Sequence, residues 1–167
     1  MIVVREAAAQ DDFAVGELLV SAFEETYRVK MPEVTMSNQR RAQLRAVEEK
    51  RKVAKVWVAL LDDKVIGTVA VWPPGAPGSE AWVAGAADLR HLAVDTRHRK
   101  SEASKLLLDE AEKWAREHGA SAVCLHVRRG VEGVARLYLN RGYQRVPSGD
   151  LDKLPDVFLE AFVLRWK

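Results

Sequence analysis

The most chemically suggestive stretch of the sequence is a cluster of basic residues just before a long helical pattern. Residues 90–105 carry five basic side chains against Asp95 and Glu102, a local excess of three positive charges, whereas the whole chain carries only +2. The basic members are Arg90, Arg97, Arg99, Lys100 and Lys105. Backbone N–H groups that begin a helix lack intrahelical partners and attract phosphate oxygens. The combination predicts a site for a phosphorylated ligand.

This basic segment is predicted to lie between a strand and the clearest helix of the chain. Residues 88–94 have strand-like composition, and residues 101–118 carry an apolar helical stripe that stops before Gly119. A strand at 122–128 follows, so a strand–helix–strand crossover should make the two strands parallel neighbours. The remaining elements of this half are a helix at 132–140, a strand from Tyr143 and a last strand at 157–166.

The first half of the chain is predicted to be antiparallel. Two valine-rich runs, 56–61 and 64–72, are joined by Asp62-Asp63 and predict a hairpin. The other elements are a strand at 2–6, a helix capped by Asp11, a basic helix at 38–52 with a solvated face, and a loop at 73–79 followed by Trp82, a packing residue. The order is β-α-α-β-β-β-α-β-α-β-β, a single α/β domain over residues 1–167.

Composition excludes several function classes. The chain has 167 residues with 26 basic and 24 acidic side chains, so nucleic acid is not the expected partner. A single cysteine, Cys124, allows no internal disulfide, and a reducing, cytoplasmic compartment is expected. The sequence predicts no signal peptide and no membrane span. Histidines at 91, 98, 118 and 126 show no metal-ligand spacing, so no metal is expected. The alanine, valine and arginine content suggests a bacterial source.

Two motifs resemble the GNAT superfamily of acyl-CoA N-acyltransferases. The first is His91-Leu-Ala-Val-Asp-Thr-Arg-His-Arg99 before a leucine-rich helix, and the second is Ala135-Arg-Leu-Tyr-Leu-Asn-Arg-Gly-Tyr143. The resemblance implies a mixed, mostly antiparallel sheet of about seven strands with four helices and a splayed central strand pair. It implies acetyl-CoA as acyl donor and direct transfer to a primary amine of a small molecule or protein.

The resemblance also implies where acetyl-CoA would bind. Backbone groups of Leu92, Ala93 and Val94 would pair with the pantetheine arm, beside the predicted gap between strands 88–94 and 122–128. The pyrophosphate would lie on the loop and first helical turn. The residues concerned are Arg99, Lys100, Ser101, Glu102, Ala103 and Ser104.

The sequence departs from the family pattern where glycines are usual. Glu102, Ser104 and Lys100 stand at small-residue positions of the phosphate loop, and Val131 replaces an asparagine that would bind pantetheine. A glutamate adds bulk and a negative charge where a phosphate should approach. Ser101 and Glu102 are also simply favourable residues for a helix start. Two readings stay open: an enzyme with weakened coenzyme binding, and a non-catalytic module for ligand sensing or protein association.

The resemblance places the hydroxyl of Tyr138 near the thioester sulfur, where it could protonate the leaving thiolate. Asp88 is the first candidate for the base that deprotonates the amine, with His126 and His91 behind it. Each has a structural alternative: Asp88 could pair with Arg90, and His126 could bond the backbone. The sequence leaves the amine acceptor open, and a homodimer through an edge strand or residues 157–164 is a further possibility.

Overall fold

The valine-rich runs of the first half form an antiparallel ladder, as predicted. In the computed structural model, which describes residues 1–166, β1 (Ile2–Glu6) pairs with β2 (Lys55–Leu61), and β2 pairs with β3 (Lys64–Trp72). The hairpin turn places Asp62 and Asp63 at φ values of 50° and 63°. Two successive positive φ values match the right-handed twist of the flanking strands. The predicted hairpin is confirmed.

Hydrogen bonding links the eight strands in the order β1-β2-β3-β4-β5-β8-β6, with β7 paired to β8. The chain divides into two units. The first unit contains Met1–Val71 and His91–Lys113, and the second contains Trp72–Arg90 and the chain from Trp114 onward. Strand β4 (Ala87–Val94) contributes its second half to the first unit and its first half to the second.

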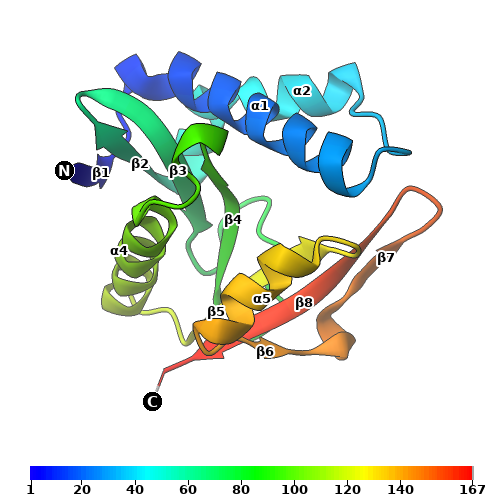
Figure 1. The fold of residues 1–167 in the computed structure, drawn as a ribbon. Coiled ribbons are helices and arrows are strands. Elements are labelled where there is room, and N and C mark those ends of the chain that lie inside the picture. The colour runs from blue at the N-terminus through cyan, green and yellow to red at the C-terminus, as the bar shows by residue number, and fades with distance from the viewer. Residues whose placement is uncertain (167) are drawn as a thin grey trace. The chain divides into compact units, whose positions relative to one another are not determined.

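Helices cover both sides of the sheet in the first unit. Figure 1 shows α1 (Asp12–Lys30) and α2 (Asn38–Arg45) side by side over strands β1 to β3, with α4 (Ala103–Glu117) on the opposite side. Gly67 of β3 permits a close approach there, because a Cβ at this position would lie 3.0 Å from Cδ1 of Leu107 in α4. This packing positions the start of α4 against the sheet.

The basic helix predicted at 38–52 is wrong in two respects. It is broken at Ala46 into α2 and α3 (Val47–Val53). Alanine favours helix, so local propensity gives no reason for the break, and packing overrides it by burying Val47 completely. The basic side chains are also not simply solvated, because Arg45 pairs with Glu17 at 2.7 Å and Arg51 with Asp12 at 2.6 Å.

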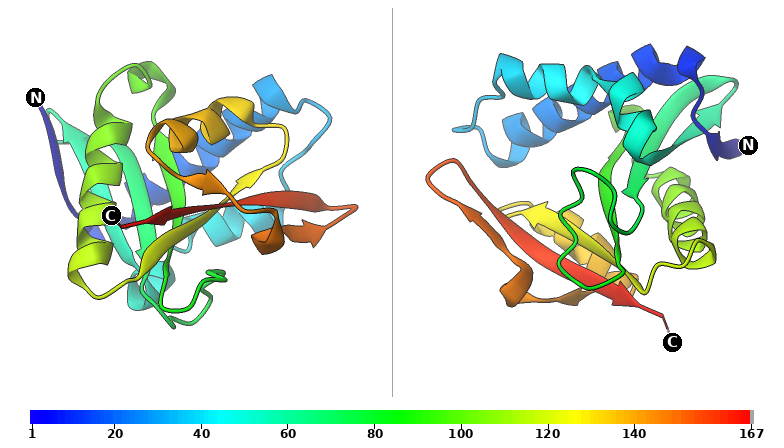
Figure 2. Two further views of the ribbon diagram at one scale, coloured as in Figure 1. Left: turned by 90° about the horizontal axis from the view of Figure 1, so that it is seen from below. Right: turned by 180° about the vertical axis from the view of Figure 1, so that it is seen from behind.

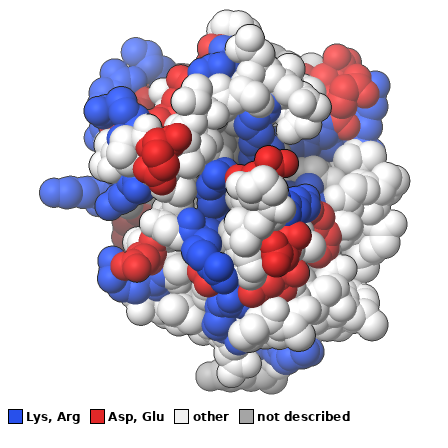
Figure 3. Space-filling view, turned by 90° about the vertical axis from the view of Figure 1, so that its right-hand side faces the viewer, with Lys and Arg blue, Asp and Glu red and all other residues white. Residues whose placement is uncertain are grey.

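Acidic residues of α1 therefore balance the basic helices, and Arg41 likewise pairs with Glu24. Both signs of charge occur side by side on the face shown in Figure 3. Asp11 precedes α1 as predicted, but its side chain does not cap that helix. It accepts hydrogen bonds from the Ala8 N–H at 2.8 Å and from Arg5 at 2.7 Å, which holds a short 3-10 turn before α1.

The second unit is built around β5 (Ala122–Arg128). β4 pairs with β5 in parallel through Ala87↔Val123 and Asp88↔Cys124, which confirms the predicted crossover. β8 (Val157–Arg165) runs antiparallel to β5, and α5 (Glu132–Asn140) follows β5 along the chain. No helix within residues 1–166 is long and apolar enough to cross a bilayer.

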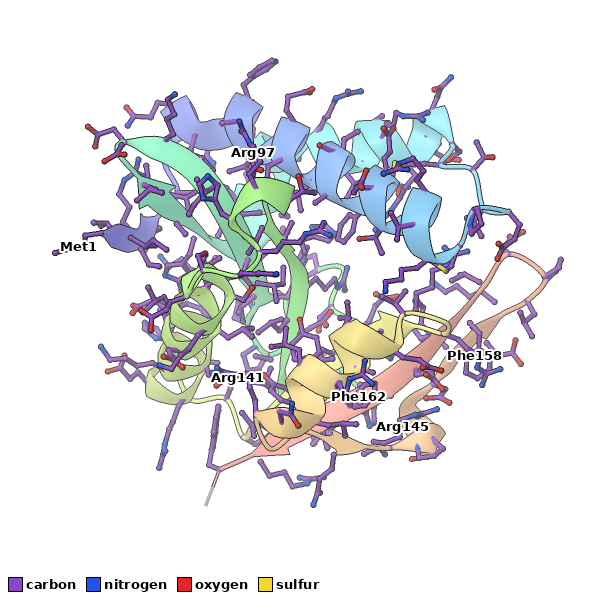
Figure 4. The ribbon with its side chains drawn as sticks, viewed as in Figure 1. Met1, Arg97, Arg141, Arg145, Phe158 and Phe162 are labelled. Atoms are coloured by element: carbon purple, nitrogen blue, oxygen red, sulfur yellow. The ribbon has the colours of Figure 1, made fainter. Side chains whose placement is uncertain are left out.

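The structure contains one strand and one helix more than the counts of about seven and four expected from sequence. The added strand is β7 (Leu151–Lys153), which forms a hairpin with β8 (Figure 2). The strand expected from Tyr143 is only β6 (Gln144–Arg145). Asp150 links them: it pairs with Arg145 at 2.5 Å and accepts from the Ala161 N–H at 2.8 Å. Arg145 lies close to Phe162 of β8 in Figure 4, 5.8 Å from the ring centroid.

Trp82 packs as predicted, within the second unit. Its ring contacts a buried cluster that includes Ala122, Cys124 and Val163. It also covers Gly149 so closely that a Cβ at that position would lie 2.4 Å from the ring. Gly149 therefore sits where no larger residue fits unless Trp82 moves.

We expect Gly149→Ala to destabilise the protein by about 1 to 3 kcal/mol, because overpacking a rigid indole forces side chains or backbone to shift. Denaturant unfolding would measure the change. Gly133→Ala is the matched control, since nothing lies within 4 Å of a Cβ added there and the residue lies in α5. Equal effects of the two substitutions would contradict the tight contact at Gly149.

Candidate functional site

The second half of β4 contains a backbone irregularity at His91. This residue has φ +60°, in the left-handed region, and the strand continues beyond it through Leu92, Ala93 and Val94. Such a conformation costs a residue other than glycine about 1 to 3 kcal/mol and persists only where the surroundings hold it. It interrupts the alternation of faces, since three partly exposed residues separate the buried ends of the strand.

A tight loop follows β4 and is held by its own polar groups. Asp95 accepts from the Arg97 N–H at 2.9 Å and pairs with the Arg97 guanidinium at 3.0 Å. These hydrogen bonds lower the pKa of Asp95 below its ordinary value. The Asp95 N–H donates to the Ile66 carbonyl at 2.8 Å, which anchors the loop on β3. Figure 4 shows Arg97 on this loop, where its side chain is exposed.

The amides that begin α4 have no partner within the helix. The first helical hydrogen bond runs from the Leu106 N–H to the Glu102 carbonyl at 3.0 Å, so the amides of residues 103–105 precede it. Ser101 Oγ accepts from the Ala103 N–H at 3.3 Å. The Glu102 side chain is exposed, and none of the hydrogen bonds within residues 1–166 is made by its carboxylate. Within the described residues, that carboxylate therefore accepts no hydrogen bond from the amides of the helix start. The helix begins two residues later than predicted.

The basic residues predicted for phosphate binding differ in their present contacts. Arg99 makes two long hydrogen bonds of 3.4 Å, to the carbonyls of Val94 and Ala22. Lys105 pairs with Asp109 at 2.9 Å on the exposed side of α4. Lys100 is exposed, and Ser104 is partly exposed in the first turn. Residues 92–104 thus lie on one continuous segment of the first unit.

Sequence reasoning missed Lys50. This lysine of α3 is only 9% exposed, and its Nζ lies 3.0 Å from Nδ1 of His91. Burial lowers the pKa of Lys50 to about 7. The signal was its spacing: Lys50 follows the buried residues Leu44 and Val47 at three-residue intervals, on the apolar side of the helical pair.

Asp88 lies in the second unit and is fully buried. Its Oδ2 accepts from the Glu80 N–H at 2.8 Å and from Arg90 Nε at 2.7 Å, and no partner within residues 1–166 reaches Oδ1. Burial raises the pKa of this carboxyl, against the opposing effect of Arg90. Arg90 also contacts the Gly78 carbonyl and lies 4.3 Å over the Trp72 ring. These contacts anchor the 73–82 loop.

The two other residues predicted for catalysis also lie in the second unit. His126 Nε2 is 2.9 Å from the Gly149 carbonyl, and its ring lies 5.0 Å from that of Trp82. Because a carbonyl only accepts, Nε2 carries the proton. Tyr138 of α5 is 4% exposed, with its ring edge-on to Tyr143 at 5.3 Å.

Two further sequence features find their place in the structure. Val131 precedes α5 and is buried, and its side chain makes no cap hydrogen bond. Within the described chain, residues 1–166, no cluster of three or more His, Cys, Asp or Glu side chains could hold a metal ion. The candidate site residues therefore fall into two groups: the 91–105 segment with Lys50 in the first unit, and Asp88, His126 and Tyr138 in the second.

The irregular strand β4 and the helix start that follows it coincide with the first sequence motif. Comparison with known proteins identifies the family. A sequence profile of the acetyltransferase (GNAT) family matches residues 14–143. The chain belongs to this family.

Relatives of this GNAT chain agree with that assignment. N-acetyltransferase 8B of Rattus norvegicus is 34% identical over 91 residues, which cover 53% of this chain and 39% of that protein. The chain thus spans about two fifths of that relative's length.

Solved structures show the same fold. A GNAT acetyltransferase from Staphylococcus aureus has TM-score 0.78 at 16% identity and covers 100% of both chains. The PaiA N-acetyltransferase of Thermoplasma acidophilum, solved with coenzyme A, has TM-score 0.72 at 17% identity and covers 99% of both chains. The fold class predicted from sequence is confirmed.

Burial of Lys50 in this GNAT chain should lower the free energy of unfolding. Moving the pKa of Lys50 from 10.5 to about 7 corresponds to a cost of order 5 kcal/mol, since each pKa unit is worth about 1.4 kcal/mol. Below pH 7 both states bind the proton and the cost is complete. Between pH 7 and 10.5 only the unfolded state binds it, so the stability of the folded chain rises with pH.

We therefore expect Lys50→Met to stabilise the protein by roughly 1 to 4 kcal/mol at pH 7, with a gain that shrinks towards pH 10. Urea unfolding across this pH range measures it. Lys52→Met on the same helix is the control, because Lys52 is exposed and pairs with Glu49 at 3.1 Å. A gain that does not vary with pH would contradict the lowered pKa.

Proposed function

We propose that this GNAT chain is an N-acetyltransferase that takes acetyl-CoA as donor substrate and transfers the acetyl group directly to a primary amine. The observation that carries the proposal is the start of α4. Its first-turn amides precede the first helical hydrogen bond, and the nearby acidic side chain, Glu102, is exposed and accepts no hydrogen bond from them within the described residues. The Glu102 carboxylate therefore does not occupy the place on these amides that a phosphate would take.

The pyrophosphate of the donor would lie on the amides of Ser104 and Lys105, with Ala103 and Ser101 completing the turn. Arg99 and Lys100 supply positive charge. The two hydrogen bonds of Arg99 are 3.4 Å long, at the weak end of the range. Exchanging them for charge-assisted bonds to phosphate oxygens would be favourable.

The pantetheine arm would pair with backbone groups of Leu92, Ala93 and Val94 along β4. A strand that presents N–H and C=O groups to a ligand can hold an extended amide-containing chain as it would hold another strand. Val131 supplies no side-chain hydrogen bond there, so the backbone must carry the binding. The kink at His91 marks where the strand changes the face it presents.

The amine nitrogen attacks the thioester carbonyl, the tetrahedral intermediate collapses, and the C–S bond breaks. Tyr138 would give its proton to the departing thiolate. A buried hydroxyl with little solvent suits this role, because a proton donor in a low-dielectric setting stabilises developing charge strongly. Asp88 bonds the Glu80 N–H, and we assign it the role of positioning the 73–82 loop. His126 bonds the Gly149 carbonyl, and we assign it the role of positioning Gly149.

The acceptor is a primary amine, of a small molecule or a protein. The single buried thiol, Cys124, agrees with a reducing compartment such as the cytoplasm. A sulfur so enclosed has a raised pKa through burial and takes no part in transfer.

Isothermal titration with acetyl-CoA and turnover of simple amines, followed by thiol release, test this function. We expect saturable binding and an approximately 100-fold lower kcat for Tyr138→Phe with unchanged acetyl-CoA affinity, because general acid catalysis is worth about 10² or more. Tyr143→Phe removes a hydroxyl from the same ring pair and serves as control. Absence of binding at millimolar acetyl-CoA would refute the proposal and favour a non-catalytic module.

Glu102 should weaken the donor complex without abolishing it. We expect Glu102→Gly to tighten acetyl-CoA binding about two- to fivefold, the equivalent of a charge near a helix end. Glu102→Gln separates charge from bulk, and Glu110→Gln, further along α4, controls for net charge. An affinity that is unchanged or weaker in Glu102→Gly would count against phosphate binding at this turn.

A further inference from the structure

The C-terminal end of α5 is closed by a backbone cap that includes Tyr138. The Tyr143 N–H donates to the Tyr138 carbonyl at 3.1 Å, and the Gly142 N–H donates to the Leu139 carbonyl at 3.1 Å. Gly142 has φ +101°, in the region where glycine carries no Cβ penalty. Two such hydrogen bonds around a glycine of positive φ form the Schellman motif of helix ends. The whole cap lies in the second unit.

The side chains of the cap also contact each other. The rings of Tyr138 and Tyr143 meet edge-on, with their centroids 5.3 Å apart and their planes at 67°. An apolar contact between these two positions commonly accompanies the hydrogen bonds of the motif. Tyr138 and Tyr143 are both buried. The residue that completes the cap therefore also limits the orientations open to the Tyr138 ring.

The cap joins α5 to the sheet. Tyr143 directly precedes β6, which pairs with β8 through Gln144↔Val163. A Cβ added at Gly142 would lie 3.6 Å from Cδ1 of Leu164, an ordinary contact distance. Space alone does not require glycine at this position, so the requirement comes from its positive φ.

The position of Tyr138 depends on this cap because α5 is short. The helix has nine residues, and Tyr138 lies in its last turn. Isolated helices shorter than about 12 residues are marginal in water, and helix ends fray. A proton donor must lie within hydrogen-bond reach of the atom that takes its proton. A misplacement of about 1 Å can lower a rate roughly 100-fold.

We propose that Gly142 and the ring of Tyr143 position the Tyr138 hydroxyl for proton donation to the leaving thiolate. This inference rests on the proposed transferase function. The CoA sulfur, which keeps the electron pair of the broken C–S bond, takes the proton of the hydroxyl. The phenolate left on Tyr138 then takes a proton from solvent. Gly142 and Tyr143 are positioning residues, and they act through Tyr138.

Substitution of the Tyr143 ring tests the side-chain contact. Tyr143→Leu removes the ring, and Tyr143→Phe keeps it. Thiol release from acetyl-CoA with ethylamine measures kcat, and titration calorimetry measures acetyl-CoA affinity. We expect Tyr143→Leu to lower kcat about 10- to 100-fold without changing the affinity. Tyr143→Phe should recover most of that loss, because the edge-on contact is made by the ring.

The Tyr138→Phe background separates positioning from a general structural effect. Without the Tyr138 hydroxyl, the ring of Tyr143 has no proton donor to position. Adding Tyr143→Leu to Tyr138→Phe should therefore change kcat by less than about twofold, a strongly non-additive result. An equal fold loss in both backgrounds would overturn the proposal.

Gly142→Ala tests the backbone of the cap, and Gly119→Ala is its matched control. Gly119 ends α4 with φ +84°, and the Ala120 N–H donates to the Ala115 carbonyl at 3.0 Å, as in the cap of α5. Nothing lies within 4 Å of a Cβ added at Gly119, so both substitutions act mainly through backbone strain. We expect similar falls in the urea midpoint, but an approximately tenfold lower kcat for Gly142→Ala alone.

The results distinguish failure of this inference from failure of the proposed function. Equal kcat losses for Gly142→Ala and Gly119→Ala would overturn positioning by the cap. A Tyr138→Phe variant with the kcat of the wild type would overturn the role of Tyr138 and this inference with it, whereas measured turnover would still support the transferase. A wild type that binds no acetyl-CoA would overturn both proposals.

Discussion

The positive φ of His91 is the constraint from which the candidate site follows. An extended strand sends successive side chains to opposite faces, and one left-handed residue changes that sequence. In β4 the change separates a buried first half, which pairs with β5, from a second half that leads into the loop and α4. The His91 ring contacts Lys50 of α3 at 3.0 Å and meets the ring of Phe23 in α1 edge-on, with the ring centroids 6.4 Å apart. The same strand thereby pairs with β5 in one unit and leads into the loop before α4 in the other.

Positive charge in the loop between β4 and α4 is only partly balanced by acidic side chains. Acidic residues of α1 pair with Arg41, Arg45 and Arg51 of α2 and α3. In the loop itself Asp95 is used internally, capping its own turn and holding Arg97. Arg99, Lys100 and the helix amides are then opposed by Glu102 alone, whose exposed carboxylate is well screened by solvent. For the proposed acetyl-CoA complex, this arrangement favours weakened over lost binding.

Much of the fold could be predicted because its patterns are local. The Asp62-Asp63 turn, the apolar stripe of α4 and the crossover to β5 each follow from residue type and spacing. The break at Ala46 could not be predicted, because alanine favours helix and tertiary packing decides there. The strand β7 could not be predicted for a similar reason. Leu151–Lys153 has no strand pattern of its own and is ordered by pairing with β8 and by the Asp150 hydrogen bonds. The candidate site divides in the same way, since the 92–104 segment is contiguous whereas Lys50 reaches His91 across 41 residues.

The burial of Lys50 calls for a physical explanation, because its ammonium group is removed from water. An ammonium removed from water must find compensation, and carboxylates are the usual partners. Here the hydrogen-bond partner is a nitrogen base, His91, and the Asp12 carboxylate adds only a small favourable charge effect. A methionine would fill the same space without this cost. Lys50 therefore lowers the free energy of unfolding, although an apolar side chain of the same length would provide equal packing.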